Sequence, residues 1–204
     1  MIFRGIYAIV DQALAGHPLE LLECMLEGGV RLVQYRAKSG IDHELVRAMH
    51  ARTQSYGALL VINDDLEAAL EADGLHVGQE DLAACDAQSL RKRLGSRLLG
   101  ISCAVPEEAL VAESLGADYT GVGPFAATAT KGDAGAPIGT AGVRSVVERT
   151  ALPVVAIGGI ALDNLAAVVR SGAAMAAVAG AIAHAHDPLE AARALVARWD
   201  ELAA

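Results

Sequence analysis

Basic residues, aromatic rings and cysteines are all scarce in this sequence. Lysine and arginine number 16 against 25 aspartates and glutamates, which gives a net charge of −9, and aromatic residues make up 3% of the chain. An acidic surface disfavours nucleic acids and anionic membranes as partners, and so few rings argue against a platform for stacking bases. An anionic ligand would therefore have to be held by local groups or by a metal ion.

The three cysteines, Cys24, Cys85 and Cys103, are scattered and lack the spacing of metal ligands. This usage is typical of packing residues in the reducing cytoplasm. The longest hydrophobic run, Gly172 to Ala183, is too short for a bilayer, which needs about 20 residues. Met1 to Val10 also lacks the pattern of a signal peptide. We therefore expect a soluble cytoplasmic protein with a single domain over residues 1–204.

A repeated pattern organises the chain: an amphipathic segment ends in glycine and an apolar, strand-like run follows, as in EGGVRLVQYR, YGALLVIND, ADGLHVGQ, LGSRLLGIS, LGADYTGVG and SGAAMAAVAG. Glycine in a left-handed conformation is the usual way of ending a helix before a strand. The predicted strands are Gly5–Asp11, Arg31–Ala37, Leu59–Asp64, Gly74–Gln79, Leu98–Cys103, Tyr119–Pro124, Pro153–Gly158 and Ala176–Ala179. The predicted helices are Leu19–Glu27, His43–Tyr56, a compact one in Leu66–Ala72, Glu107–Leu115, Val143–Arg149, Asn164–Ser171 and Pro188–Leu202.

This alternation predicts parallel strands and a small α/β fold, a single-domain (βα)8 TIM barrel. A doubly wound open sheet is the alternative, although no GxGxxG fingerprint follows the first strand. In a parallel barrel the carboxyl ends of all strands lie at one end, so residues far apart in sequence meet there.

The second strand ends in VQYRAK, where alternation places Gln34, Arg36 and Lys38 on one face. A closed barrel has no edge, so these polar groups should lie at its mouth. An apolar interior cannot hold the charge of Arg36 without an anion beside it. We therefore expect an anion next to Arg36.

Acidic residues follow the third and fourth strands. Asp64 and Asp81 would lie on neighbouring strand ends and could hold one Mg²⁺ between them. Capping of helices is the alternative: Asp65 could be an N-cap, and Asp81 could cap a segment from Leu82 onward.

Ser102 lies at the end of the fifth strand, and His76 lies within the fourth. The sequence offers no Ser-His-Asp arrangement around them. We interpret Ser102 as a residue that hydrogen-bonds a ligand.

The stretch from Gly121 to Gly139 is a short strand followed by a long loop that carries Thr128, Thr130 and Lys131. A loop of this length is more often a lid or a binding loop than a plain connection, although a solvated surface loop is the alternative.

Two glycine-containing strand ends follow, with Gly158 and Gly159 after the seventh strand and Ala179 and Gly180 after the eighth. Backbone N–H groups at such ends commonly bind phosphate, and close packing of helix on strand is the alternative. The residues thus indicate a barrel enzyme with two anionic substrates, one of them a metal-bound polyphosphate.

In this order, QYRAK, INDD, DGLHVGQED, GIS, GPFAATATKGDAGAPIG, PVVAIGGI and VAGAI resemble the thiamine phosphate synthase family over essentially the whole chain. The resemblance implies a Mg²⁺-dependent transferase of thiamine biosynthesis that joins hydroxymethylpyrimidine diphosphate to thiazole phosphate by a dissociative displacement. It implies that the pyrimidine diphosphate contacts Gln34, Arg36, Lys38, Asn63, Ser102 and Lys131, of which Arg36, Lys38, Ser102 and Lys131 are catalytic. It implies that Asp64 and Asp81 hold the metal, and that the thiazole phosphate contacts Thr128, Thr130, Gly159, Ala179 and Gly180.

Two alternatives remain at this point. Thiazole tautomerase-like relatives carry a histidine at the position of Ala104 and lack the acid at Asp81. A barrel that binds phosphate without catalysis is the other, because Gly180 lacks the hydroxyl that the family has there. We expect small-molecule substrates, no nucleic acid and no membrane as partners, and the sequence leaves homo-oligomerisation open.

Overall fold

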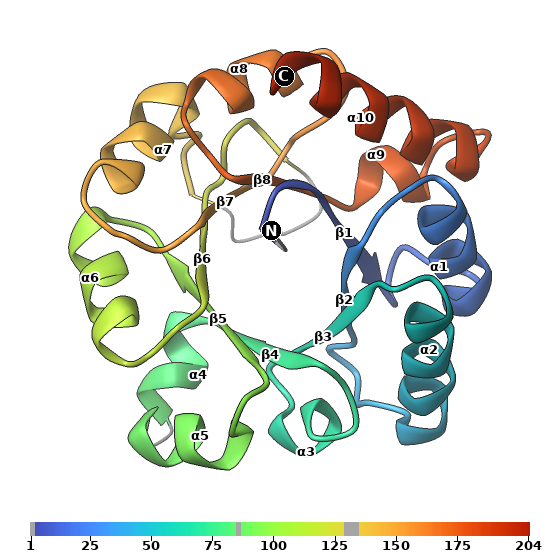
Figure 1. The fold of residues 1–204 in the computed structure, drawn as a ribbon, viewed down its shortest axis with the longest axis horizontal. Coiled ribbons are helices and arrows are strands. Elements are labelled where there is room, and N and C mark those ends of the chain that lie inside the picture. Colours follow the sequence, from blue (N-terminus) through green and yellow to red (C-terminus); the bar gives the residue numbers. More distant parts are fainter. Residues whose placement is uncertain (1–2, 85–86, 129–134) are drawn as a thin grey trace.

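Strands rich in valine, isoleucine and leucine close into a parallel barrel in the order β1 to β8, with β8 pairing back onto β1 (Figure 1). The computed structural model describes residues 3–84, 87–128 and 135–204. The strands are β1 (Gly5–Asp11), β2 (Leu32–Arg36), β3 (Leu59–Asn63), β4 (Gly74–Val77), β5 (Leu98–Cys103), β6 (Tyr119–Val122), β7 (Val154–Ile157) and β8 (Met175–Val178). The predicted single-domain (βα)8 barrel is confirmed, and the open-sheet alternative is wrong.

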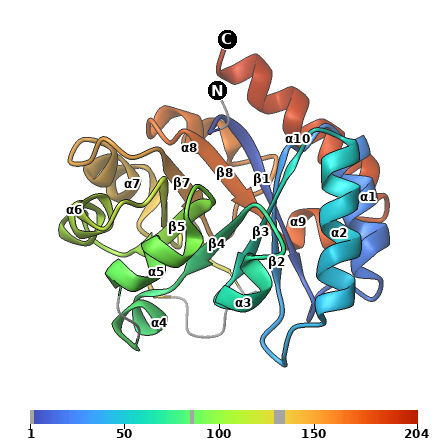
Figure 2. The same cartoon turned by 60° about the horizontal axis from the view of Figure 1, so that its bottom comes forward.

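Helices form the outer ring around this barrel (Figures 1 and 2). They are α1 (Pro18–Glu27), α2 (His43–Ser55), α3 (Leu66–Ala69), α4 (Gln79–Ala84), α5 (Ala87–Leu94), α6 (Pro106–Ser114), α7 (Gly139–Val147), α8 (Leu165–Arg170), α9 (Gly180–Ala183) and α10 (Pro188–Leu202). The sequence pattern predicted neither the pair α4 and α5 nor the four-residue α9. Helices α4 and α9 are too short to show a helical period, and α5 is polar over most of its length.

Side chains alternate between two apolar regions on either side of the strands. Tyr7, Ile9 and Val61 lie in the cluster that fills the barrel, whereas Ala8 and Ile62 lie in the larger cluster under the helices. The period of two that the strands show in sequence therefore decides which residues reach the interior.

Glycine follows five of the helices, in the left-handed conformation that the sequence pattern predicts. Positive φ angles of 61° to 99° occur at Gly29, Gly57, Gly95, Gly116 and Gly172, each just before a strand. Gly74 was expected to act in the same way, and that expectation is wrong. At Gly74 a Cβ atom would lie 2.6 Å from the Leu98 Cβ atom, so glycine there permits the close approach of β4 and β5.

The last helix closes the ring at the seam between β8 and β1. Helix α10 packs on α1, α8 and α9, and Figure 2 shows it alongside α1. Its N-cap is Asp187, whose carboxylate accepts a hydrogen bond from the Glu190 N–H, and it buries Trp199. Within the described residues, no helix combines the length and apolar content needed to cross a bilayer.

Candidate active site at the barrel mouth

The end of β2 carries a buried amide and a paired guanidinium. Gln34 is 4% exposed, and Arg36 forms an ion pair with Asp11 at the end of β1. The anion expected beside Arg36 is therefore present in the protein itself. Only one guanidinium nitrogen makes this ion pair, so further N–H groups of Arg36 can serve a ligand.

Sequence reasoning missed Asp11. The residue lies directly across from Arg36 in the register of β1 and β2, and it is 5% exposed. Its other carboxylate oxygen accepts a hydrogen bond of 2.9 Å from the Ala13 N–H. The sequence pattern could have identified Asp11, because the spacing of two places it on the same inward face of the first strand as Tyr7 and Ile9.

Lys38 lies beyond the end of β2, in an exposed turn. The alternation that predicted a shared face with Gln34 and Arg36 therefore stops before it. The turn leaves the direction of the lysine side chain independent of the strand.

Asp64 and Asp81 come together at the ends of β3 and β4. Asp64 has a left-handed backbone with φ of 64°, and its carboxylate accepts a hydrogen bond of 3.4 Å from the Gly78 N–H. Asn63 also donates its side-chain N–H to that carboxylate. Burial raises the pKa of Asp64 above its usual range, and the nearby carboxylate of Asp81 raises it further.

One of the two capping alternatives is confirmed. Asp65 is the N-cap of α3, and its side chain accepts from the Ala68 N–H at 2.9 Å. The capping of a segment from Leu82 by Asp81 is wrong, because α4 already begins at Gln79 and Asp81 lies in its first turn.

The donor set of this corner fits a hard divalent cation. The carboxylate of Asp81 lies close enough to raise the pKa of Asp64. A bound cation would offset the repulsion between the two negative charges. Asn63 adds an amide group beside them. In the described part of the chain, no cluster of three or more His, Cys, Asp or Glu side chains could hold a metal, so any metal here would rely on this pair together with ligand or water oxygens.

A chain of hydrogen bonds crosses the interior below the mouth. The His76 Nε2 atom lies 2.9 Å from the Ser102 Oγ atom, and the His76 Nδ1 atom lies 3.1 Å from the Tyr119 hydroxyl. That hydroxyl is 2.8 Å from the hydroxyl of Tyr7, to which Gln34 donates from Nε2 at 3.0 Å. The substrate-binding candidates Gln34 and Ser102 are thus joined across the barrel.

This pairing is not a nucleophile with its base. Burial lowers the pKa of His76 to about 4, and the group behind its second nitrogen is the phenol of Tyr119 rather than a carboxylate. A Ser-His-Asp triad needs that carboxylate to stabilise the imidazolium that forms. The absence of a triad expected from the sequence agrees with this geometry.

The long loop after β6 has an anchored base. The N–H groups of Phe125 and Ala126 donate to the carbonyls of Ile157 and Gly158 at 2.8 and 2.9 Å. At the other side of the base, Ile138 N–H donates to Pro124 at 2.9 Å. Thr128 belongs to the described part of this loop, whereas Thr130 and Lys131 lie outside the described residues.

The glycines after β7 lie against this loop base. Gly158 and Gly159 have φ angles of 97° and 64°. A Cβ atom on Gly159 would lie 2.4 Å from the carbonyl oxygen of Ala127, so only glycine permits the contact. At this pair the close contact is with the loop base, not the packing of helix on strand that was the alternative to a phosphate site.

Asn164 holds the turn that these glycines begin. Its side-chain N–H donates to the Gly159 carbonyl at 2.8 Å, and its side-chain oxygen accepts from the Ala161 N–H at 3.0 Å. Ala179 and Gly180 lie on the neighbouring strand end, where Ala179 is the N-cap of α9. The first N–H groups of a helix have no acceptor within the helix. Sequence reasoning missed Asn164, which it assigned to a helix start.

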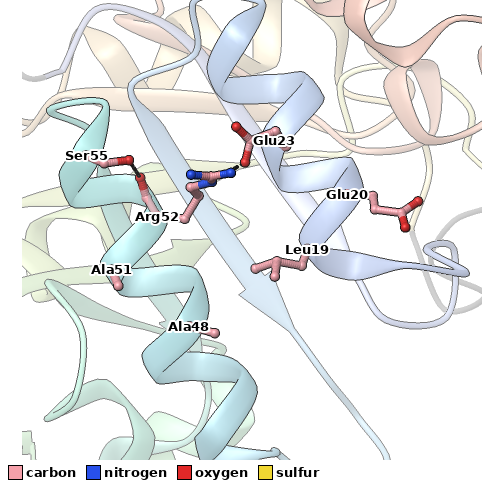
Figure 3. Close-up of a pocket in the computed structure, with 7 residues that line it drawn as sticks. All are labelled: Leu19, Glu20, Glu23, Ala48, Ala51, Arg52 and Ser55. Carbon is pink, nitrogen blue, oxygen red and sulfur yellow. Dashed lines mark hydrogen bonds and ion pairs between the residues drawn. The ribbon is translucent and has the colours of Figure 1, made fainter.

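A separate groove lies on the outer ring between α1 and α2 (Figure 3). Its volume is about 490 Å³, and its lining residues are Leu19, Glu20, Glu23, Ala48, Ala51, Arg52 and Ser55. Glu23 pairs with Arg52 and accepts from the Tyr56 hydroxyl at 2.7 Å. Since these residues come from helices rather than strand ends, the groove is distinct from the candidate site.

Comparisons with known proteins agree on one family. A family model described as thiamine monophosphate synthase matches residues 6–182. Thiamine-phosphate synthase of Moorella thermoacetica is 44% identical over 93% of each chain, and that of Herpetosiphon aurantiacus is 43% identical over 96% of this chain and 97% of the relative. The solved structure of thiamine phosphate pyrophosphorylase from Pyrococcus furiosus matches with a TM-score of 0.90 and 32% identity, covering 100% of this chain and 98% of that one. The chain belongs to the thiamine monophosphate synthase family.

Proposed function

We propose that this barrel joins hydroxymethylpyrimidine diphosphate to thiazole phosphate, releasing thiamine phosphate and pyrophosphate. Members of the family carry the name of this synthase, which is a transferase. The observation that supports the proposal is that two groups of residues suited to phosphate ligands lie at one barrel mouth. The first group is Arg36 with the Asp64–Asp81 pair, and the second is the Gly158–Gly159 turn after β7 with the N-terminus of α9 after β8.

The first site suits a diphosphate. Arg36 offers fixed N–H donors because Asp11 orients its guanidinium, and Lys38 and Lys131 would add positive charge. Asp64 and Asp81 would hold Mg²⁺, which neutralises a pyrophosphate leaving group when it is bound. Gln34, Asn63 and Ser102 remain as neutral contacts for the pyrimidine.

The second site suits a phosphate monoester. The turn at Gly158 and Gly159, together with the first N–H groups of α9 at Ala179 and Gly180, would bind its oxygens. Thr128 lies next to Ala127, whose carbonyl touches Gly159, so the loop can add hydroxyls from Thr128 and Thr130. The anchored loop base would let the segment beyond it cover both ligands and exclude water.

The reaction breaks the bond between the pyrimidine methylene carbon and the pyrophosphate oxygen. The electron pair of that bond leaves with pyrophosphate, and the thiazole nitrogen then supplies the pair that forms the new C–N bond. No proton has to be removed in this exchange. The residues therefore need to bind, orient and stabilise charge, which fits a site whose buried histidine is neutral.

The alternatives have less support. The thiazole tautomerase reading conflicts with Ala104 and Asp81, and the similar relatives are named as synthases. A non-catalytic barrel rests on Gly180 alone, and backbone N–H groups remain at that position to bind phosphate.

The test combines the purified protein with both substrates and Mg²⁺ and follows thiamine phosphate and pyrophosphate. We expect both products in equal amounts and none with a chelator. Asp64→Ala and Asp81→Ala should lower the rate by at least about 100-fold. Glu80→Ala, which removes an exposed acid beside Asp81, is the matched control and should keep the rate. Phosphate-ligand binding without any product would support the non-catalytic barrel instead.

A further inference from the structure

Five side chains from five strand regions form one hydrogen-bonded line through the barrel interior. The line runs from Gln34 through Tyr7, Tyr119 and His76 to Ser102, with successive distances of 3.0, 2.8, 3.1 and 2.9 Å. We call these residues the relay. Its ends, Gln34 and Ser102, are two of the three neutral contacts assigned above to the pyrimidine, and its three middle residues have no part in the proposed reaction.

The barrel is shaped to hold the relay. Tyr7 and Tyr119 are 2% and 0% exposed, and their rings meet edge to face with centroids 5.7 Å apart. On β5, a Cβ atom at Gly100 would lie 2.2 Å from the Tyr119 ring and 2.5 Å from the His76 Nδ1 atom. Only glycine therefore leaves room for the two relay rings at this point.

The direction of the hydrogen bonds follows from the end at Gln34. Its Nε2 group can only donate, so the Tyr7 oxygen accepts and its proton points to Tyr119. Tyr119 then donates to the His76 Nδ1 atom. His76 is buried with a phenol and a hydroxyl as its partners and no carboxylate, so it is neutral and carries its proton on Nε2.

The His76 Nε2–H group therefore donates to the Ser102 oxygen, and the Ser102 proton is free to point toward a ligand. At the other end, the Nε2 group of Gln34 is engaged with Tyr7, which leaves its carbonyl oxygen to accept from a ligand. The site thus presents one donor and one acceptor with fixed identities.

We propose that Tyr7, Tyr119 and His76 are positioning residues that fix Ser102 as a donor and Gln34 as an acceptor, and thereby select an aminopyrimidine over an oxopyrimidine. This inference rests on the proposed function, because it takes Gln34 and Ser102 as pyrimidine contacts. An aminopyrimidine edge offers an N–H donor beside a ring-nitrogen acceptor. The oxo form reverses both, since its ring nitrogen carries the proton and its exocyclic oxygen accepts.

The test measures the dissociation constants of two phosphorylated pyrimidine alcohols, one with the amino group and one with the oxo group, by calorimetry with Mg²⁺ present. The wild-type protein should favour the amino compound by about 100-fold, because the oxo compound leaves buried polar groups unmatched. Tyr7→Phe and Tyr119→Phe interrupt the relay and should lower this ratio about tenfold. His76→Gln keeps an N–H within reach of Ser102 and should retain more of the ratio than His76→Leu.

Tyr35→Phe is the matched control. Tyr35 is also a fully buried strand tyrosine, but it faces the helices, and its hydroxyl has no hydrogen-bond partner in the described structure. Its replacement should leave the ratio unchanged. A merely structural role of the relay would weaken both ligands equally in the variants.

The outcomes separate the two proposals. Thiamine phosphate formation by the wild type with an unchanged ligand ratio in Tyr7→Phe and Tyr119→Phe overturns the relay inference alone. If one of these variants does not fold, the other tyrosine variant and the comparison of His76→Gln with His76→Leu still test the relay inference. Each substitution interrupts a different hydrogen bond of the relay. A wild-type protein that binds neither pyrimidine and makes no product overturns the proposed function, and the relay inference with it.

Discussion

Asp64 is the residue at which the backbone and the charge distribution are both unfavourable. It adopts a left-handed conformation, which costs a non-glycine residue about 1 kcal/mol, and its carboxylate lies beside that of Asp81. Such costs are common where a site is arranged for a ligand that has yet to bind. Asp64 would therefore link the stability of the protein to the proposed Mg²⁺.

Asp81→Asn should raise the melting temperature of the metal-free protein at pH 7 while abolishing turnover. Because the pKa of Asp64 is raised in the folded state, stability falls as the pH rises from the ordinary aspartate value of about 3.9 through the raised value. The variant removes the repulsion that contributes to this fall. Thermal unfolding across this pH range, with and without Mg²⁺, measures both effects.

The control for this prediction is Glu80→Gln, which neutralises the neighbouring exposed acid. It should change the melting temperature little and leave the stabilisation by Mg²⁺ intact. Equal melting of the wild type and Asp81→Asn at every pH would show that the two carboxylates do not repel each other.

His76 makes the folded state sensitive to acid. Its pKa is about 4 in the fold, against about 6.5 when it is exposed in the unfolded chain. The unfolded state therefore binds more protons between these values, and stability falls as the pH drops through that window. Between pH 7 and pH 5 this group should cost about 2 kcal/mol.

Urea unfolding at pH 7 and pH 5 checks this expectation. The loss of unfolding free energy on acidification should be smaller in His76→Gln than in the wild type by about the amount given for this group. An equal loss in both proteins would mean that another group is responsible for the acid sensitivity.

At the scale of elements, the turn between β7 and α8 carries the proposed phosphate contacts, and Asn164 holds it at both ends. Asn164→Ala should raise the KM for thiazole phosphate about tenfold, with a smaller change in kcat, because the glycine turn loses its support. Asp163→Ala, at the exposed neighbour, is the control. A normal KM for thiazole phosphate in Asn164→Ala would separate this turn from the phosphate site.

The strands and long helices could be predicted from the sequence because they repeat a period, and β1, β5 and α10 begin and end where the pattern indicates. The strand ends were harder, since Lys38 and Asp81 follow turn and helix geometry rather than strand alternation. The Asp11–Arg36 pair and the relay depend on which strands become neighbours and on their register. These contacts form only when the barrel closes, so the sequence pattern does not predict that Tyr119 hydrogen-bonds Tyr7.

At the scale of the whole molecule, α10 joins the first and last parts of the chain. Trp199 is 2% exposed in the cluster under the helices, and its indole N–H has no hydrogen-bond partner among the described residues. Trp199→Ala should lower the free energy of unfolding by about 3–5 kcal/mol through the cavity it leaves. Trp199→Phe should cost clearly less, because no hydrogen bond is lost. Urea denaturation of the two variants measures the difference, and equal costs would contradict the assignment to packing.

Apolar side chains close the end of the barrel opposite the mouth. Leu32, Val61, Val155 and Met175 fill its interior, and the Phe3 ring lies 5.4 Å from that of Tyr119 between their centroids. The barrel is therefore open at one end only, so both substrates must enter and both products must leave through the same mouth.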